Sequence, residues 1–197
     1  MNRGLWPCVA LLAAGCAATP RQVVEAPPSI DATVAQSWTA QGRLAVAVAG
    51  QGGSGAFTWR QDSARSELAV RGPLGVGAFS VTVDGDEVSV TDGQGVVLSG
   101  DDARRQVQAR LGADLPLGSL RYWMLGLPAP APPAQVQDSA QPPVRVVDQG
   151  GWQIAYDEFA RFGSLTAPTR LTATGPNVRL KLVFDAWQLT PPSGSPP

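Results

Sequence analysis

Short runs in which apolar and polar residues alternate dominate the chain between residues 37 and 100. Alternation at every second position puts the apolar side chains of a strand on one face and the polar ones on the other. Glycine and Asp-Gly turns separate the runs, as in hairpins. The pattern predicts an antiparallel meander whose strands are GRLAVAVAG, SGAFTWRQ, SELAVRG, GAFSVTVDG, DEVSVTDG and GVVLSG.

The apolar spacing then lengthens to that of helices. Acidic residues at 101–102 give a helix start, Ala103, Val107 and Leu111 recur every four residues, and Gly112 is placed to close the helix. Pro116 begins a second expected helix. Its single apolar stripe, before Gly126 and Pro128 end it, consists of Leu117, Leu120, Trp123, Met124 and Leu127.

The last third of the chain returns to strands. Residues 128–143 are rich in proline and alanine and predict a long exposed loop. Strand patterns follow in PVRVVDQ, GWQIAYDEF, TRLTATG and VRLKLVFDAWQL. A sheet of about ten strands with so few helices must curl on itself or use the helices as a lid. We therefore expect a mainly β fold, in which a large curled antiparallel sheet, an incomplete barrel, encloses an apolar cavity under a helical lid.

The N-terminus resembles the signal peptide of a bacterial lipoprotein. A weakly basic start and an apolar run too short to span a bilayer lead to Leu12-Ala13-Ala14-Gly15-Cys16, which is similar to a lipobox. The resemblance implies that Cys16 becomes the first mature residue and carries acyl chains, and that the two alanines after it favour the outer membrane. A secreted protein cleaved nearby is the alternative. The expected division is signal 1–15, flexible tether 16–35, domain 36–190 and disordered tail 191–197.

Composition removes several classes of function. The chain has no histidine, which excludes Ser-His-Asp triads, Cys-His dyads and histidine metal sites. The net charge of −1 argues against nucleic acid as a partner. Cys8 leaves with the signal, so the mature chain holds one cysteine and no internal disulfide. No catalytic residue, metal or cofactor is expected.

Two further patterns are interpreted as turns. Residues 50–55 match G-x-G-x-x-G, but the alternating Ala56-Phe57-Thr58-Trp59 follows where a dinucleotide site needs a helix, so we expect a hairpin loop. Asp84, Asp86 and Glu87 lie between two strand runs and predict a hairpin turn, since Val88 stands where an EF-hand loop needs an oxygen ligand.

The stretch RGPLGVGAF places a leucine at a turn tip. Pro73 and Gly75 suit a tight turn between two strands, and Leu74 between them has nothing local to cover it. Leu74 either folds back onto the sheet or lid, or it contacts an apolar partner such as a membrane.

Several segments together resemble the LolB family of outer-membrane lipoprotein receptors. They are GRLAVAV, GSGAFTWRQ, GPLG, LPLGSLRYWMLGLP, GWQIAY and RLKLVFDAWQL, in the order and spacing of that family. The resemblance implies a domain like that of LolA and LolB, which accepts acylated lipoproteins from the periplasmic carrier LolA and inserts them into the outer membrane without nucleotide hydrolysis. It implies a lipid-anchored monomer that faces the periplasm and is not an enzyme. It also gives Leu74, with Pro73 and Gly75, the role of membrane insertion.

Acyl chains need shielding from water. Each methylene in water costs about 0.8 kcal/mol, so a triacylated cysteine with about 40 methylenes costs on the order of 30 kcal/mol. Alternation alone nominates an acyl-chain cavity, although ordinary core packing also turns these side chains inward. The nominated residues are Leu44, Val46, Phe57, Trp59, Leu68, Val70, Phe79, Val81, Leu120, Trp123, Leu127, Ile154, Leu180, Leu182 and Phe184.

Two other functions stay open. A structural or assembly lipoprotein would bind a protein partner through its sheet and enclose no usable cavity. An envelope hydrolase would need a carboxylate pair, for which Asp157 and Glu158 are the candidates.

Overall fold

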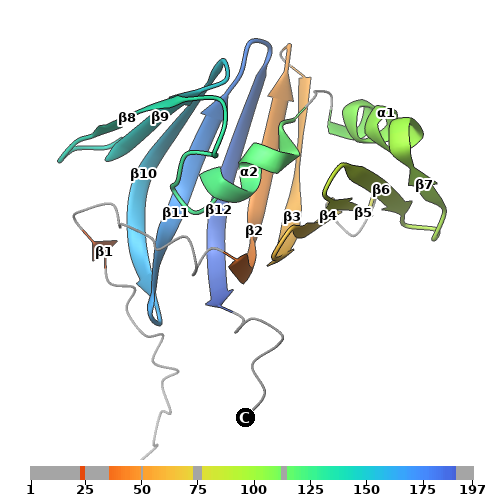
Figure 1. The fold of residues 1–197 in the computed structure, drawn as a ribbon, viewed down its shortest axis with the longest axis horizontal. Coiled ribbons are helices and arrows are strands. Elements are labelled where there is room, and N and C mark those ends of the chain that lie inside the picture. The colour runs from red at the N-terminus through yellow and green to blue at the C-terminus, as the bar shows by residue number, and fades with distance from the viewer. Residues whose placement is uncertain (1–22, 25–35, 50, 73–76, 112–114, 190–197) are drawn as a thin grey trace, which may run out of the picture.

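A computed structural model describes residues 23–24, 36–49, 51–72, 77–111 and 115–189 (Figure 1). Their main element is one antiparallel sheet in the order β7-β6-β5-β4-β3-β2-β12-β11-β10-β9-β8, with β1 added beside β10. The strands are β1 Val23–Val24, β2 Ser37–Val48, β3 Gln51–Asp62, β4 Arg65–Arg71, β5 Phe79–Asp84, β6 Glu87–Asp92, β7 Val97–Ser99, β8 Ala134–Asp138, β9 Arg145–Gln149, β10 Trp152–Phe162, β11 Leu165–Thr174 and β12 Val178–Leu189.

The sheet curls but does not close. β7 and β8 are its two edges, and they do not pair with each other within the described residues. The centre is built from the first and last strands of the domain, since β2 pairs with β12 from Val48↔Val178 to Trp38↔Leu189. A curled open sheet has one concave face, and α2 lies across it in Figure 1. The expected fold class, an incomplete antiparallel barrel with helices, is confirmed.

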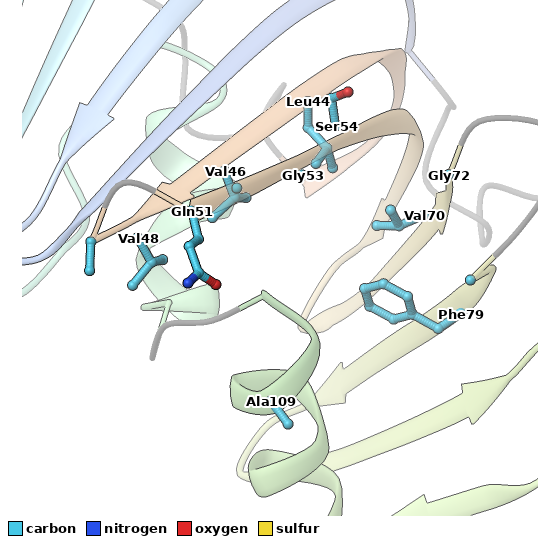
Figure 2. A pocket seen from close by; sticks show the side chains of 13 residues that line it. Leu44, Val46, Val48, Gln51, Gly53, Ser54, Val70, Gly72, Phe79 and Ala109 are labelled. Carbon is cyan, nitrogen blue, oxygen red and sulfur yellow. The ribbon is translucent and has the colours of Figure 1, made fainter.

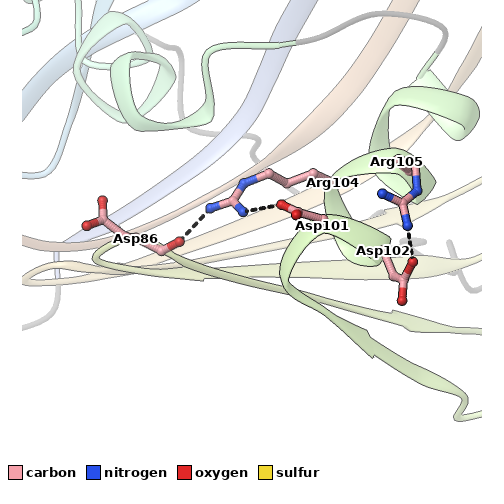
Figure 3. A network of polar contacts seen from close by, with 5 residues as sticks. All are labelled: Asp86, Asp101, Asp102, Arg104 and Arg105. Carbon is pink, nitrogen blue, oxygen red and sulfur yellow. Dashed lines mark hydrogen bonds and ion pairs between the residues drawn. The ribbon is translucent and has the colours of Figure 1, made fainter.

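Helix α1, Gly100–Leu111, forms where the four-residue spacing predicts it. Ala103 and Val107 are buried against the core, and the helix packs on β6 and β7. Arg104 ties its start to the β5–β6 turn by donating to the carbonyl oxygen of Asp86 at 2.7 Å and to the Asp101 carboxylate at 3.2 Å (Figure 3). Gly112, expected to close this helix, lies outside the described residues.

Helix α2, Leu117–Trp123, is shorter than the apolar stripe suggested. The chain leaves the helix after Trp123 and reaches Gly126, whose φ of +81° a side-chain-bearing residue rarely adopts. Leu127 therefore lies beyond the helix and is only half-buried, whereas Leu120 and Trp123 are buried.

Two loop predictions were wrong. Residues 51–55 are not a hairpin loop but the first part of β3, paired with β2 from Val48↔Gln51 to Leu44↔Gly55. Glycines carry no side chain to show alternation, so the partner strand imposes the extended conformation. Within the expected loop 128–143, Ala134–Asp138 forms the edge strand β8 on β9. Two residues of the expected tether also pair, as β1.

The acidic cluster behaves as predicted. Asp84 ends β5, Glu87 begins β6, and the two residues pair across the tight turn. Arg65 on β4 forms an exposed ion pair with Asp84 at 3.4 Å. An ion pair of this kind contributes little to stability, so the cluster needs no chemical role.

Candidate functional site

The concave face of the sheet carries the apolar half of each alternating strand. On β2, Leu44 and Val46 are buried while Arg43 is exposed, and on β12 Leu180 and Leu182 are buried while Lys181 is exposed. Antiparallel pairing sets these side chains opposite one another, Leu44 against Leu182 and Val46 against Leu180. Two neighbouring cavities lie on this face.

The larger space, here called the outer cavity, has a volume of about 590 Å³. It lies between the β2–β3 hairpin, the ends of β4 and β5, and helix α1 (Figure 2). Its lining is mixed, with glycines and Gln51 beside apolar side chains. The lining residues are Leu44, Val46, Val48, Ala49, Gln51, Gly52, Gly53, Ser54, Val70, Gly72, Gly77, Phe79 and Ala109.

The second space, here called the inner pocket, lies under α2 and is nearly filled by the side chains around it. Its free volume is about 20 Å³, against about 590 Å³ for the outer cavity, so it has no room for an acyl chain. Every side chain that lines it is apolar: Leu44, Val46, Phe57, Trp59, Leu68, Leu115, Leu120, Met124, Leu180 and Leu182. A site of this composition suits hydrocarbon and offers nothing to a polar ligand.

The two spaces are contiguous. Leu44 and Val46 line both of them, so these two side chains form the boundary between the outer cavity and the inner pocket. An elongated apolar ligand that entered the outer cavity would meet this boundary first. Passing it requires the side chains of α2, chiefly Leu120 and Met124, to withdraw from the inner pocket.

Most of the nominated cavity residues lie around these spaces. Val70 and Phe79 line the outer cavity; Phe57, Trp59, Leu68, Leu120, Leu180 and Leu182 line the inner pocket; and Leu44 and Val46 line both. The other five nominated residues line neither space. Four of them are packed in the hydrophobic core, namely Val81, Trp123, Ile154 and Phe184, and the partly buried Leu127 packs against that core. The alternation is the same for both groups, which is why the sequence does not separate them.

Other lining residues escaped sequence analysis. Gly52 and Gly53 carry no alternation signal, and Ala109 does not belong to the apolar series at four-residue spacing, Ala103, Val107 and Leu111. Met124 belonged to the predicted apolar stripe but was not nominated for the cavity, although the stripe is a signal that could have found it. Leu115 precedes α2 and had no periodic signal at all.

The helix over the inner pocket is fastened at its C-terminal end. Trp123 Nε1 donates to Gln149 Oε1 at 2.8 Å, and the Tyr156 hydroxyl donates to the Trp123 carbonyl oxygen at 2.7 Å. Burial raises the pKa of Tyr156 above its usual range, so this hydroxyl keeps its proton. Arg145 adds a bond to the Gly126 carbonyl oxygen at 3.0 Å.

The start of α2 is held less firmly. Pro116 occupies the N-cap and provides no side-chain hydrogen bond to the helix. The contacts of Leu115 and Leu120 there are apolar, and apolar contacts are non-directional. Among the described residues, the side-chain hydrogen bonds that tie this segment to β9 and β10 therefore lie at the C-terminal end of α2.

The remaining predicted positions, Cys16 and the turn Pro73, Leu74 and Gly75, lie outside the described residues. Gly72 and Gly77, which flank residues 73–76, both line the outer cavity. Among the described residues, neither helix has the length and apolarity to cross a bilayer, and no group of acidic or cysteine residues is arranged to hold a metal ion.

Comparison with known proteins gives consistent relatives. A protein named outer-membrane lipoprotein LolB from Stutzerimonas stutzeri is 32% identical over 194 residues, covering 93% of this chain and 94% of its own. One of the same name from Nitrosococcus oceani is 33% identical over 156 residues, covering 78% and 77%. The crystal structure of a LolA superfamily protein from Nitrosomonas europaea aligns with a TM-score of 0.44 at 9% identity, covering 79% of this chain and 87% of that one.

The family model described as outer membrane lipoprotein LolB matches residues 36–187. That match spans nearly all of the described sheet and both helices. The chain therefore belongs to the outer membrane lipoprotein LolB family.

Proposed function

We propose that this chain is a lipid-anchored receptor of the outer membrane that accepts acylated lipoproteins from a LolA-like periplasmic carrier and inserts them into that membrane. The observation that carries the proposal is the pair of contiguous spaces on the concave face, one roomy with a mixed lining, the other almost filled and lined only by apolar side chains. No nucleotide hydrolysis or other catalysis is needed.

The composition of the inner pocket supports acyl chains as the ligand. Shielding about 40 methylenes from water is worth on the order of 30 kcal/mol, so a carrier or receptor must cover most of them. The inner pocket has hydrocarbon walls from β2, β3, β4 and β12. Its free volume in the empty protein is too small for any chain, so cargo must replace side chains that now fill it.

Helix α2 provides the side chains that cargo replaces. Leu120 is 5% exposed and Met124 is fully buried, and both point into the inner pocket. When the first turn of α2 lifts, Leu120 leaves the inner pocket, and the flexible side chain of Met124, just after the fastened last turn, changes its rotamer. Acyl chains then take the place of these two side chains against Leu180 and Leu182. Acceptance then exchanges one apolar contact for another, and net transfer follows the difference in affinity between carrier and receptor.

Delivery involves the turn that carries Leu74. Its flanking residues Gly72 and Gly77 line the outer cavity, so cargo that leaves by this cavity passes the base of the turn. One inserted leucine supplies about 2 kcal/mol, enough for transient contact with a bilayer beside a protein that is already anchored through Cys16.

A transfer assay tests the proposal. The protein carrying Cys16→Ala is mixed with a carrier loaded with an acylated lipoprotein, and acceptance and delivery to liposomes are measured separately. Leu74→Glu is expected to accept cargo normally and to deliver it slowly. Val136→Glu places the same charge at an exposed valine on the edge strand β8 and is expected to behave like the parent protein.

The outcomes separate the two halves of the proposal. Failure of the parent protein to take cargo from the carrier would overturn the receptor role. Equal delivery by the parent protein and Leu74→Glu would remove Leu74 from the insertion step and leave reception intact.

A further inference from the structure

The glycine-rich start of β3 has an exposed edge that faces the outer cavity. On one side, residues 51–55 pair with β2. On the other side, the pairing of β3 with β4 begins only at Ala56↔Arg71, and no described strand pairs with residues 51–55 there. In an antiparallel strand, each residue directs its N–H and C=O groups to the same side, and successive residues alternate sides. Part of this stretch therefore presents hydrogen-bonding backbone groups to the cavity.

The side chains of this stretch leave that backbone uncovered. Gln51, Gly53 and Gly55 occupy the inward positions, in line with the buried Phe57 and Trp59. A Cβ added at Gly53 would meet no atom of the described residues within 4 Å, because the outer cavity occupies that space. At Gly55 an added Cβ would lie 2.5 Å from the Arg71 carbonyl oxygen, so that position excludes other residues.

The cavity thus has two chemically different sides. Figure 2 shows Gln51 extending from β3 toward the side where α1 carries Ala109, while Val70 and Phe79 lie on the strands beyond. One side offers N–H groups and a carboxamide, and the other offers hydrocarbon. The inner pocket next to it offers hydrocarbon alone.

We propose that the outer cavity binds the diacylglyceryl linkage of the cargo cysteine, whereas the inner pocket binds the acyl tails. This inference rests on the proposed receptor function. A triacylated cysteine joins its tails through two esters and one amide, whose carbonyl oxygens accept hydrogen bonds and lose water when they are buried. The N–H groups that part of this stretch leaves unpaired within the described residues, and the Gln51 carboxamide, replace that water. The tails then run past Leu44 and Val46 into the inner pocket.

Gly53 is the position that keeps this subsite open. Its φ lies outside the left-handed region and its surroundings are empty, so Leu fits there without backbone strain. The added side chain would occupy the space assigned to the ester linkage and cover the neighbouring backbone. Thr58→Leu, on the outer face of the same strand, adds a leucine away from the cavity and is the matched control.

Equilibrium binding to three probes tests the inference with the mature chain carrying Cys16→Ala, whose own acyl chains do not compete. The probes are a tripalmitoylated cysteine lipopeptide, its analogue with ether bonds in place of both esters, and palmitate. The parent protein is expected to bind the ester form about 2- to 10-fold more tightly than the ether form for each hydrogen bond lost. Gly53→Leu is expected to lose this preference and to bind palmitate within twofold of the parent, and Gly53→Ala is expected to show a smaller loss.

Each other result has a defined meaning. Equal binding of ester and ether forms by the parent protein would overturn the inference, as would a Gly53→Leu variant that loses palmitate as strongly as the lipopeptide. An equal loss in Thr58→Leu would also overturn it, because the effect would not come from the cavity. If the parent protein binds neither palmitate nor lipopeptide, the receptor function itself falls, and the inference falls with it.

Discussion

Truncating Met124 to alanine should lower the stability of the empty protein and raise its affinity for acyl chains. Met124 is fully buried and fills the inner pocket beside Leu120, leaving a free volume of about 20 Å³. Replacing a buried methionine by alanine costs about 2–5 kcal/mol, part of it for the space left behind. In the ligand-bound protein an acyl chain occupies that space. The substitution should therefore destabilise the bound form of Met124→Ala much less than the empty form.

Because the substitution destabilises the empty form more than the bound form, the difference in free energy adds to the affinity for the ligand. A loss of about 2 kcal/mol confined to the empty form raises the affinity for an acyl ligand about 30-fold. Urea denaturation of the empty protein gives the stability loss, and titration with palmitate gives the affinity. Leu165→Ala is the control, because Leu165 is 3% exposed in the core at the far end of β11 and lines neither space.

The two variants should therefore differ in kind. Leu165→Ala is expected to lose a similar amount of stability and to bind palmitate like the parent protein. Unchanged or weaker palmitate binding by Met124→Ala would refute the reasoning, since it would show that Met124 is not displaced by the ligand.

Three structural predictions concern the attachment of α2 and of the edge strand. Gln149→Leu removes the partner of the buried Trp123 indole N–H and of the Ala129 backbone, and urea denaturation should show a loss of about 3–6 kcal/mol; a loss below 1 kcal/mol would contradict the attachment. Gly126→Ala requires φ +81° and should cost more than about 1 kcal/mol in the same assay; no loss would show that the turn relaxes. The hydrogen bond from Arg145 lowers the pKa of Asp138, so Asp138→Asn should reduce the melting temperature at pH 7, and the difference from the parent should shrink as the pH falls below the usual range of aspartate and the Asp138 carboxyl is protonated; a difference that does not shrink on acidification would exclude this ion pair as its cause.

The sequence predicted the parts of the fold in which side chains carry a periodic signal. β12 alternates without interruption from Val178 to Phe184, and the four-residue spacing of Ala103 and Val107 predicted helix α1. Inward positions followed from the same alternation, which is why most nominated cavity residues surround the two spaces. Alternation reports a face of the sheet and not a position along it, so Ile154 was nominated with Leu180 although only the latter lines a space.

The missed features depend on partners distant in sequence. Gly53 is extended because it pairs with Val46 on β2. A run of glycines has no alternation of apolar and polar side chains from which this pairing could be predicted. β8 is held to β9 partly through Asp138 and Arg145, whose side chains lie 2.7 Å apart, while its own residues come from a segment rich in proline and alanine. α2 ends before Leu127 because its last turn bonds to β9 and β10, a tertiary constraint that overrides the apolar stripe.

The central claim is that acyl chains bind on the concave face, in the space that α2 fills in the empty protein. A lipopeptide with a photoreactive diazirine on one acyl chain, bound to the protein and irradiated, tests this when mass spectrometry maps the labelled residues. Because neighbouring residues of one strand point to opposite faces of the sheet, the labelled positions show which face the acyl chain contacts. The account predicts labels on Leu44, Val46, Leu180 and Leu182; labels on the outward Arg43, Arg179 and Lys181 instead would contradict it.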